Sequence, residues 1–396
     1  MKKVVIELIP VLLVIIGIST VNVQAQDNDQ PATAEKTENE TKKKSSEDQY
    51  YEKPAKFSYS FDGEIHYNDV VQDLNEANPT GELDFHKFAV KSSYYLSSAW
   101  SVASKVIVEH SFDPNYDGGD VYVSNLYVKY KYSKKFYVTS GVISVPTSGG
   151  KKGFYGTVEL SPVEKYLSYA WREAGIGVAG SLNDNISYKA TLTSGLDPYE
   201  LSSKSVIYSA RNHDFFASLN NVATGVQLVY DNDYDVRFGF SALYSGLNKS
   251  GESSETFDGA NYTFGEVFGA YKIGYVGTRA VATFSSIQGI EEINEVFHNK
   301  AGSAHAGALF EVSYDFSRFL NNDSQHLYTI LRSEYYDSQF RTTGISDNSK
   351  YEHYDYSLGI VYQPIKSLEI KADYQIQRFG DKYSSQLFDL SLGFHF

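Results

Sequence analysis

The chain has 396 residues, a formal net charge of -14 and no cysteine. The negative charge argues against a nucleic-acid partner, which needs a basic surface, and the lack of cysteine excludes disulfides, thiolate metal sites, cysteine nucleophiles and a lipid anchor on an N-terminal cysteine. Tyrosine and phenylalanine are frequent, at 34 and 24 residues, which suits strands that end in aromatic girdles at a membrane surface. The length allows one large barrel or two ordinary domains.

The N-terminal segment, residues 1–25, has the pattern of a secretory signal peptide. Lys2 and Lys3 precede an apolar run, and Ala25 offers a small residue for cleavage. A retained membrane anchor is the weaker interpretation, because the apolar run is short for a bilayer span. Residues 26–56 are polar and charged and carry too few apolar side chains to fold alone. We expect them to form a disordered linker in the periplasm.

From residue 57 onward the chain repeats segments of alternating apolar and polar residues, the mark of a strand with two different faces. In the first segment Phe57, Tyr59 and Phe61 share one face, whereas Glu64 and His66 share the other. About sixteen such strands are expected, at residues 57–68, 88–96, 100–108, 121–132, 136–145, 174–182, 186–196, 222–230, 236–244, 262–273, 275–284, 304–316, 327–335, 354–362, 368–376 and 386–396.

The last segment shows the alternation most clearly. Its apolar face carries Phe388, Leu390, Leu392, Phe394 and Phe396, and the chain stops there. A soluble protein rarely ends on an apolar strand, whereas a transmembrane barrel pairs its last strand with its first and faces lipid. The terminal phenylalanine, with apolar residues at every second position before it, also resembles the C-terminal signal of bacterial outer-membrane barrels.

Short turns alternate with long connections along the series. The long connections are expected at residues 68–83, 110–120, 146–173, 195–221, 247–261, 286–303, 337–353 and 380–385. A soluble β-sandwich, the competing fold, has no reason to separate loop lengths in this way. We therefore expect residues 57–396 to form an all-β transmembrane antiparallel β-barrel in the bacterial outer membrane, with short periplasmic turns and long extracellular loops.

The polar face of so wide a barrel would line a water-filled channel. By alternation its basic residues are Lys91, Lys105, Lys129, Lys131, Lys189, Arg237, Arg279 and Arg332. Basic residues concentrate on the early strands, and the later strands also carry acids. Two interpretations stay open: a field that biases anions toward one wall, or charges that pair with one another and keep the channel wet.

The long connection at residues 146–173 is a candidate constriction loop. Gly149, Gly150 and Gly153 allow it to bend sharply into the lumen. Its candidate solute contacts are the basic residues Lys151, Lys152, Lys165 and Arg172, which would meet Glu159 and Glu164. Opposed ranks of bases and acids make a transverse field that selects small charged solutes. The alternative is an extracellular surface loop with solvated charges.

Several motifs in and around this loop resemble the phosphate-selective porin O/P family. They are ELSPVEK at residues 159–165, the W-x-E-x-G-x-G pattern from Trp171 to Gly177, GVISVP at residues 141–146 and GEIHY at residues 63–67. The resemblance spans residues 57–396 and implies a homotrimer of barrels with about sixteen strands that passes small anions such as phosphate. The chain departs from the founding members in having only eight arginines and no lumenal arginine ladder.

The expected function is therefore that of an outer-membrane porin for passive diffusion of small hydrophilic solutes, with a preference for anions and no cofactor. An enzyme on a barrel would need a Ser/His or Asp/His constellation, but the nine histidines are scattered and no G-x-S-x-G motif occurs, so we predict no catalytic activity. A plugged transporter needs about twenty-two strands. A structural or adhesive barrel stays open as an alternative.

Overall fold

The computed structural model describes residues 56–73, 81–109, 120–147, 161, 163–164, 171–211, 219–232, 236–251, 253, 255–320, 324–381 and 383–396. The expected signal peptide lies outside these residues. So does the expected linker, apart from its last residue, Lys56.

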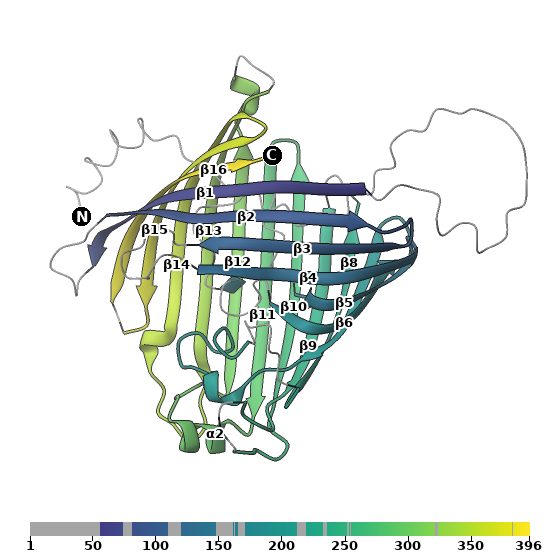
Figure 1. The fold of residues 1–396 in the computed structure, drawn as a ribbon. Coiled ribbons are helices and arrows are strands. Elements are labelled where there is room, and N and C mark those ends of the chain that lie inside the picture. Colours follow the sequence, from purple (N-terminus) through teal and green to yellow (C-terminus); the bar gives the residue numbers. More distant parts are fainter. Residues whose placement is uncertain are drawn as a thin grey trace, which may run out of the picture.

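Sixteen strands form one closed barrel in which every strand is antiparallel to its two neighbours (Figure 1). The prediction of about sixteen strands is confirmed, with ends that differ by a few residues. The strands are β1 (Lys56–Asp73), β2 (Glu82–Tyr95), β3 (Trp100–Glu109), β4 (Asp120–Ser133), β5 (Phe136–Ser144), β6 (Arg172–Ser181), β7 (Ile186–Ser194), β8 (Val222–Asp231), β9 (Val236–Gly246), β10 (Asn261–Ile273), β11 (Val276–Gln288), β12 (Ala304–Asp315), β13 (His326–Arg341), β14 (Glu352–Ile365), β15 (Leu368–Phe379) and β16 (Ser384–His395).

The last strand closes the barrel against the first. The backbone N–H of Phe396 donates to the carbonyl of Phe61 at 3.0 Å, and the N–H of Phe61 donates to the carbonyl of Phe396 at 2.7 Å. The register continues through pairs such as Ile65 with Leu392. Closure leaves no sheet edge with unpaired backbone groups, which only a complete barrel achieves inside a bilayer.

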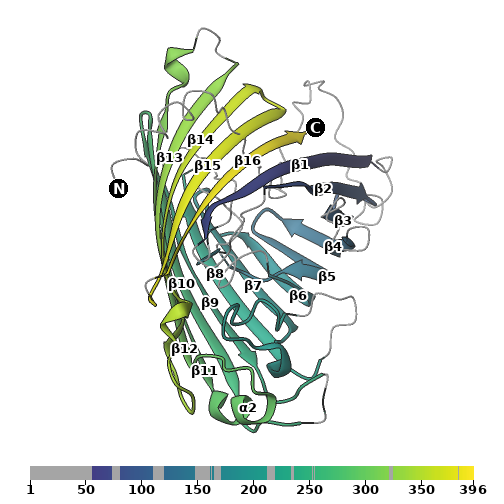
Figure 2. The ribbon, with the colours of Figure 1, turned by 90° about the vertical axis from the view of Figure 1, so that its left-hand side faces the viewer.

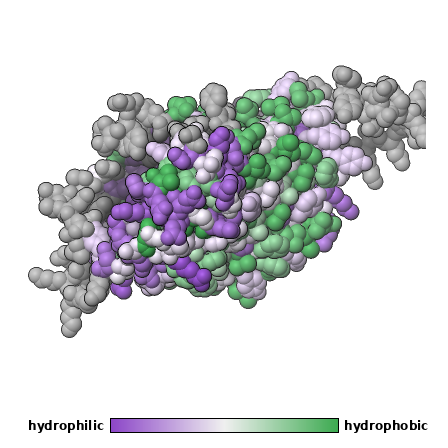
Figure 3. All heavy atoms as spheres, turned by 90° about the horizontal axis from the view of Figure 1, so that it is seen from below, coloured by the Kyte–Doolittle hydropathy of each residue, from purple (hydrophilic) through white to green (hydrophobic). Residues whose placement is uncertain are grey.

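The two faces of the wall have opposite chemistry. On β11, Arg279, Thr283 and Ser285 are buried, whereas Ala280 and Phe284 between them are exposed. Large apolar side chains are exposed in the same alternating way on other strands and make the outer surface hydrophobic beside the polar loop end (Figure 3). Apolar side chains outside and polar side chains inside are what a barrel surrounded by lipid requires. Among the described helices, none combines the length and apolar character needed to cross a bilayer.

The connections depart from strict alternation of length in two places. The connection between β12 and β13 is extended and holds the 3-10 turn η4 (Ser317–Phe319), whereas the connection between β15 and β16 is only residues 380–383. The latter is tight because the Asp381 carboxylate accepts a hydrogen bond from the N–H of Tyr383 at 3.1 Å. The long connections also contain regular structure that the sequence did not indicate: α2 (Ile290–Phe297), η3 (Pro198–Glu200) and η5 (Ser349–Tyr351).

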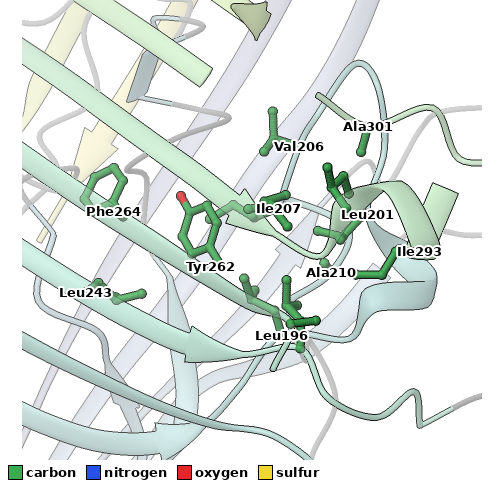
Figure 4. Packing of buried hydrophobic residues seen from close by; sticks show 14 of the residues in the cluster. Leu196, Leu201, Val206, Ile207, Ala210, Leu243, Tyr262, Phe264, Ile293 and Ala301 are labelled. Carbon is green, nitrogen blue, oxygen red and sulfur yellow. The ribbon is translucent and has the colours of Figure 1, made fainter. Parts of the chain in front are cut away.

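An apolar core lies at the barrel end that carries α2. It joins Tyr262 and Phe264 of β10 to Leu201 and Ile207 of the β7–β8 connection and to Ile293 of α2 (Figure 4). The alternation that indicated a polar channel lining did not indicate this apolar core. The reason is that the connections carry apolar residues of their own, and burying each one contributes about 1.5–3 kcal/mol.

Candidate functional site

The connection between β5 and β6 reaches across the interior of the barrel. The structure describes three residues of its middle part, Ser161, Val163 and Glu164, and all three are buried. Ser161 Oγ donates to Glu334 of β13, and Arg279 of β11 donates to Glu164. Since β11 and β13 stand far from β5 and β6 in the strand order, this part of the loop lies inside the barrel rather than on its outer surface.

Arg279 and Glu334, which bind the loop, belong to a continuous ion-pair network. Arg279 Nη1 lies 3.8 Å from Glu311, which also lies 3.4 Å from Nε of Arg332, and Nη1 of Arg332 lies 3.5 Å from Glu334. Glu334 accepts a further hydrogen bond from the backbone N–H of Val163. All four wall side chains are buried. Because charges removed from water need good partners, this network binds the described part of the loop firmly to the wall; we call it the latch.

The wall beyond the latch, from β14 through β16 to β1, carries mainly buried carboxylates. They are Asp355, Glu369, Asp373, Asp389 and Glu64. Lys371 is fully buried among them, with Nζ 3.9 Å from Glu64. Glu64 also lies 3.0 Å from Nε2 of His66 and accepts a hydrogen bond from Ser391 at 3.3 Å. These acids are therefore largely withdrawn from the water of the lumen.

The wall from β2 to β7, which adjoins β1 in the ring (Figure 2), carries lysines that stay partly exposed. Lys91 lies 2.6 Å from Asp62, and its side chain keeps 17% of its exposed area. Lys105 stands directly opposite Lys91 in the β2–β3 register. Arg172, at the start of β6, acts electrostatically on both Lys105 and Lys189. The inner surface of this wall is thus basic and in contact with solvent.

The predicted site residues fall into four sets. Lys151, Lys152 and Lys165 lie outside the described residues. Lys91, Lys105, Lys129, Lys131, Lys189 and Arg172 gather on the β2–β7 side and are partly buried. Arg279 and Arg332 belong to the latch, whereas Arg237 lies 3.5 Å from Asp231 and interacts electrostatically with Arg279. Glu164, which we expected to meet the basic residues of its own loop, is bound by Arg279 of β11, and three of those basic residues lie outside the described part of the chain.

Sequence reasoning missed Glu173 as a structural centre. Its carboxylate accepts a hydrogen bond from Nε1 of Trp171 at 2.7 Å and another from Oγ of Ser194 at 2.6 Å. The W-x-E spacing was the available signal, because residues two apart share one face of a strand. Gly175 follows on the same face, where an added Cβ would lie 2.2 Å from the carbonyl oxygen of Leu192. The W-x-E-x-G part of the pattern thus has a packing role.

No family model matches the chain. A protein of Aquifex aeolicus (strain VF5), described as uncharacterized, is 23% identical over 355 residues, which is 84% of this chain and 78% of that protein. Among solved structures, the anion-selective porin from Comamonas acidovorans is similar with a TM-score of 0.58 and 10% identity, over 87% of this chain and 100% of that one. The trimer form of OmpT from Vibrio cholerae gives a TM-score of 0.55 and 12% identity, over 87% and 100%.

These similarities concern the fold. The chain is a closed sixteen-stranded porin-like barrel, and its apolar outer face is that of a barrel embedded in a bacterial outer membrane.

Proposed function

We propose that this protein is an outer-membrane channel for passive diffusion of small hydrophilic solutes, and that it prefers anions. The observation that carries the preference is the contrast between the two walls. The lysines of β2 to β7 are partly exposed to the lumen, whereas most acids of β12 to β16 are buried and Arg279 and Arg332 are engaged in the latch. A dissolved ion interacts most strongly with charges that remain accessible in the pore.

The resemblance to the phosphate-selective porin O/P family supports anions as the solute class. The structural neighbour from Comamonas acidovorans carries the words anion-selective in its own description. More specifically, we propose that phosphate is among the anions that pass through the channel. The lysine cluster supports it because several ammonium groups at close range suit a multiply charged oxyanion.

We also propose that the barrels assemble as homotrimers, as one form of OmpT from Vibrio cholerae does. Ser92 pairs with the exposed Tyr59 in the β1–β2 register and therefore points outward. Its Oγ lies 2.7 Å from that of Ser104. Hydroxyls on the outer face suit a contact with another barrel better than contact with lipid. Gel migration of unheated protein tests this, and a monomer that conducts normally would contradict it.

The channel proposal is tested by reconstituting the purified protein in planar bilayers. We expect stable ohmic current steps and, across a salt gradient, a reversal potential of the sign given by anion flow. The triple variant Lys91→Gln, Lys105→Gln and Lys189→Gln should reduce the anion-to-cation permeability ratio several-fold.

The matched control changes Lys134, Lys135 and Lys366 to Gln, because these lysines are exposed in the short turns. It should leave the permeability ratio within error of the parent. Correctly folded protein that shows no conductance would contradict the channel, and an unchanged ratio in the triple variant would contradict the role of the lysine wall.

A further inference from the structure

The connection between β7 and β8 crosses the mouth of the barrel. We call its described part, residues 195–211, the strap. At its base Gly195 donates its N–H to the carbonyl of Asn221, beside β8, at 2.9 Å. At its tip Tyr336 of β13 donates to the carbonyl of Lys204 at 2.8 Å, and Ser338 of β13 donates to the carbonyl of Ser203 at 2.5 Å.

The tip has a third anchor beyond β13. Oγ of Ser203 donates to the hydroxyl of Tyr351 in η5 at 2.8 Å. The strap therefore starts at β7 and β8 and ends at β13 and the β13–β14 connection, while β9 to β12 stand between these points in the barrel. A segment held at two such separated places on a closed ring must run over the opening between them.

The space beneath the strap is filled. Leu201, Val206 and Ile207 have exposures of 0–1% and pack with Ile293 of α2 and Tyr262 of β10 (Figure 4). The strap and this core together occupy the part of the mouth enclosed by β8 to β13. The rest of the mouth is bounded by β14 to β16 and by β1 to β7, which include the strands of the lysine wall.

The far end of the strap is tied to the end of the constriction loop. The guanidinium carbon of Arg211 lies 5.4 Å from the centre of the Trp171 ring and 5.5 Å from that of Tyr208. Burial lowers the pKa of Arg211 to about 10, and the neighbouring Tyr262, Tyr208 and Glu173 act in the opposite direction. Arg211 is therefore charged at neutral pH, and its cation–π contacts join the two loops.

The backbone carbonyl of Lys204 accepts the hydrogen bond from Tyr336. The Lys204 side chain takes no part in that anchor. That side chain is exposed, and its charge reaches the imidazole of His353 on β14. A positive charge at the rim raises the local concentration of anions before they enter the lumen. The backbone carbonyl of Lys204 therefore anchors the strap and its ammonium group carries the charge. A substitution of the side chain removes the charge and leaves the anchor in place.

We propose that the strap sets the upper size limit for solutes at this mouth, and that Lys204 is an anion-attracting residue at the entrance. The proposal rests on the channel function proposed above. It assigns size selection to the β7–β8 connection in addition to the loop held by the latch.

The experiment uses two variants of the full chain reconstituted in liposomes and bilayers. The release variant carries Tyr336→Phe, Ser338→Ala and Ile207→Asp, which removes two anchors and places a charge in the apolar core. It should pass neutral sugars larger than the parent admits and show a higher single-channel conductance, with an unchanged permeability ratio. Lys204→Gln should keep the parent's size limit and lower the anion preference about twofold.

The matched control carries Tyr354→Phe and Leu219→Asp, because the Tyr354 hydroxyl bonds Glu352 and the Leu219 side chain is exposed. It should behave like the parent. An unchanged sugar limit in a folded, conducting release variant would overturn the strap as a size filter, and an unchanged permeability ratio in Lys204→Gln would overturn the entrance charge.

Crosslinking reports the position of the strap without relying on conductance. The chain has no cysteine, so Ser203→Cys with Ser338→Cys introduces the only two thiols. A short thiol-specific crosslinker should join them in folded protein, and the joined form should keep the parent's sugar limit. Failure to crosslink would overturn the strap geometry. Crosslinking of the folded double variant, with no conductance in either the variant or the parent, would overturn the channel function and the filter with it.

Discussion

The β2–β7 wall and the β11–β16 wall are built from the same alternating pattern but use their charges differently. On the first, Lys87 lies 3.5 Å from Glu109 and Lys91 lies 2.6 Å from Asp62, with all four side chains about one-fifth exposed. On the second, the side chains of the latch keep 5% or less of their exposed area.

The difference separates structural charges from functional ones. Arg279 and Arg332 are consumed in holding Glu164 and the wall acids, so they stabilise the shape of the pore and contribute little to attracting solutes. Partly exposed lysines contribute little to stability, because surface ion pairs give about 0–1 kcal/mol, but they face the lumen, where we propose that they act on solutes. The following experiments test this division, beginning with the largest expected effect.

Replacing Arg332 with Ala should cause the largest loss of stability. It leaves Glu311 and Glu334 buried without their common partner, and breaking a buried pair in this way costs about 3–5 kcal/mol. The free energy of unfolding in guanidinium, measured in detergent or lipid, reports the change. Arg341→Ala on the same strand is the control, since Arg341 is exposed, and it should stay within about 0.5 kcal/mol of the parent. Equal losses of unfolding free energy in Arg332→Ala and Arg341→Ala would show that the buried latch contributes no more to stability than an exposed arginine does.

Replacing Glu164 with Ala should release the loop while the barrel stays folded. The loop loses its ion pair to Arg279, and a hydrogen bond to a charged group contributes about 1.5–3 kcal/mol. We expect higher and noisier single-channel conductance than the parent shows. Glu291→Ala in α2 is the control, because Glu291 is exposed. A Glu164→Ala channel with the parent's steady conductance would show that the latch does not position the loop.

Replacing Lys189 with Gln should act on selectivity rather than on stability. The free energy of unfolding should change by about 0.5 kcal/mol or less, while the reversal potential across a salt gradient moves toward zero. Lys135→Gln, in the exposed β4–β5 turn, should change neither quantity. A large loss of stability without a change in reversal potential would place Lys189 with the structural charges.

Ionic strength should give the smallest and most graded effect. Raising salt from about 0.1 M to about 1 M shortens the Debye length from about 10 Å to about 3 Å. The anion preference due to the lysines should fall, because their charges are in contact with water. The stability difference between parent and Arg332→Ala should change little, because the latch is buried. If salt reduced the anion preference and the stability difference to the same extent, the lysines and the latch would not differ in their contact with solvent.

Much of the barrel could be predicted from local pattern. Alternation identified all sixteen strands and assigned Arg279 and Arg332 to the face on which they are buried. The apolar terminal strand predicted closure, which the paired Phe61 and Phe396 confirm. These features follow from the period of two in a strand and from the need to satisfy every backbone group in lipid.

The partners across the lumen could not be predicted in that way. Glu164 and Arg279 are 115 residues apart in the chain, and Lys204 and Tyr336 are 132 residues apart. Nothing in either loop indicates which strand it will meet, since that depends on the width of the closed ring and on the path that each loop takes inside it. The sequence by itself determined the strands, their two faces and the closure of the barrel, because these are repeating local properties. Only the tertiary structure decided which charges are buried in ion pairs and which ones stay exposed to the lumen, because contacts between segments that the closed wall brings together determine this.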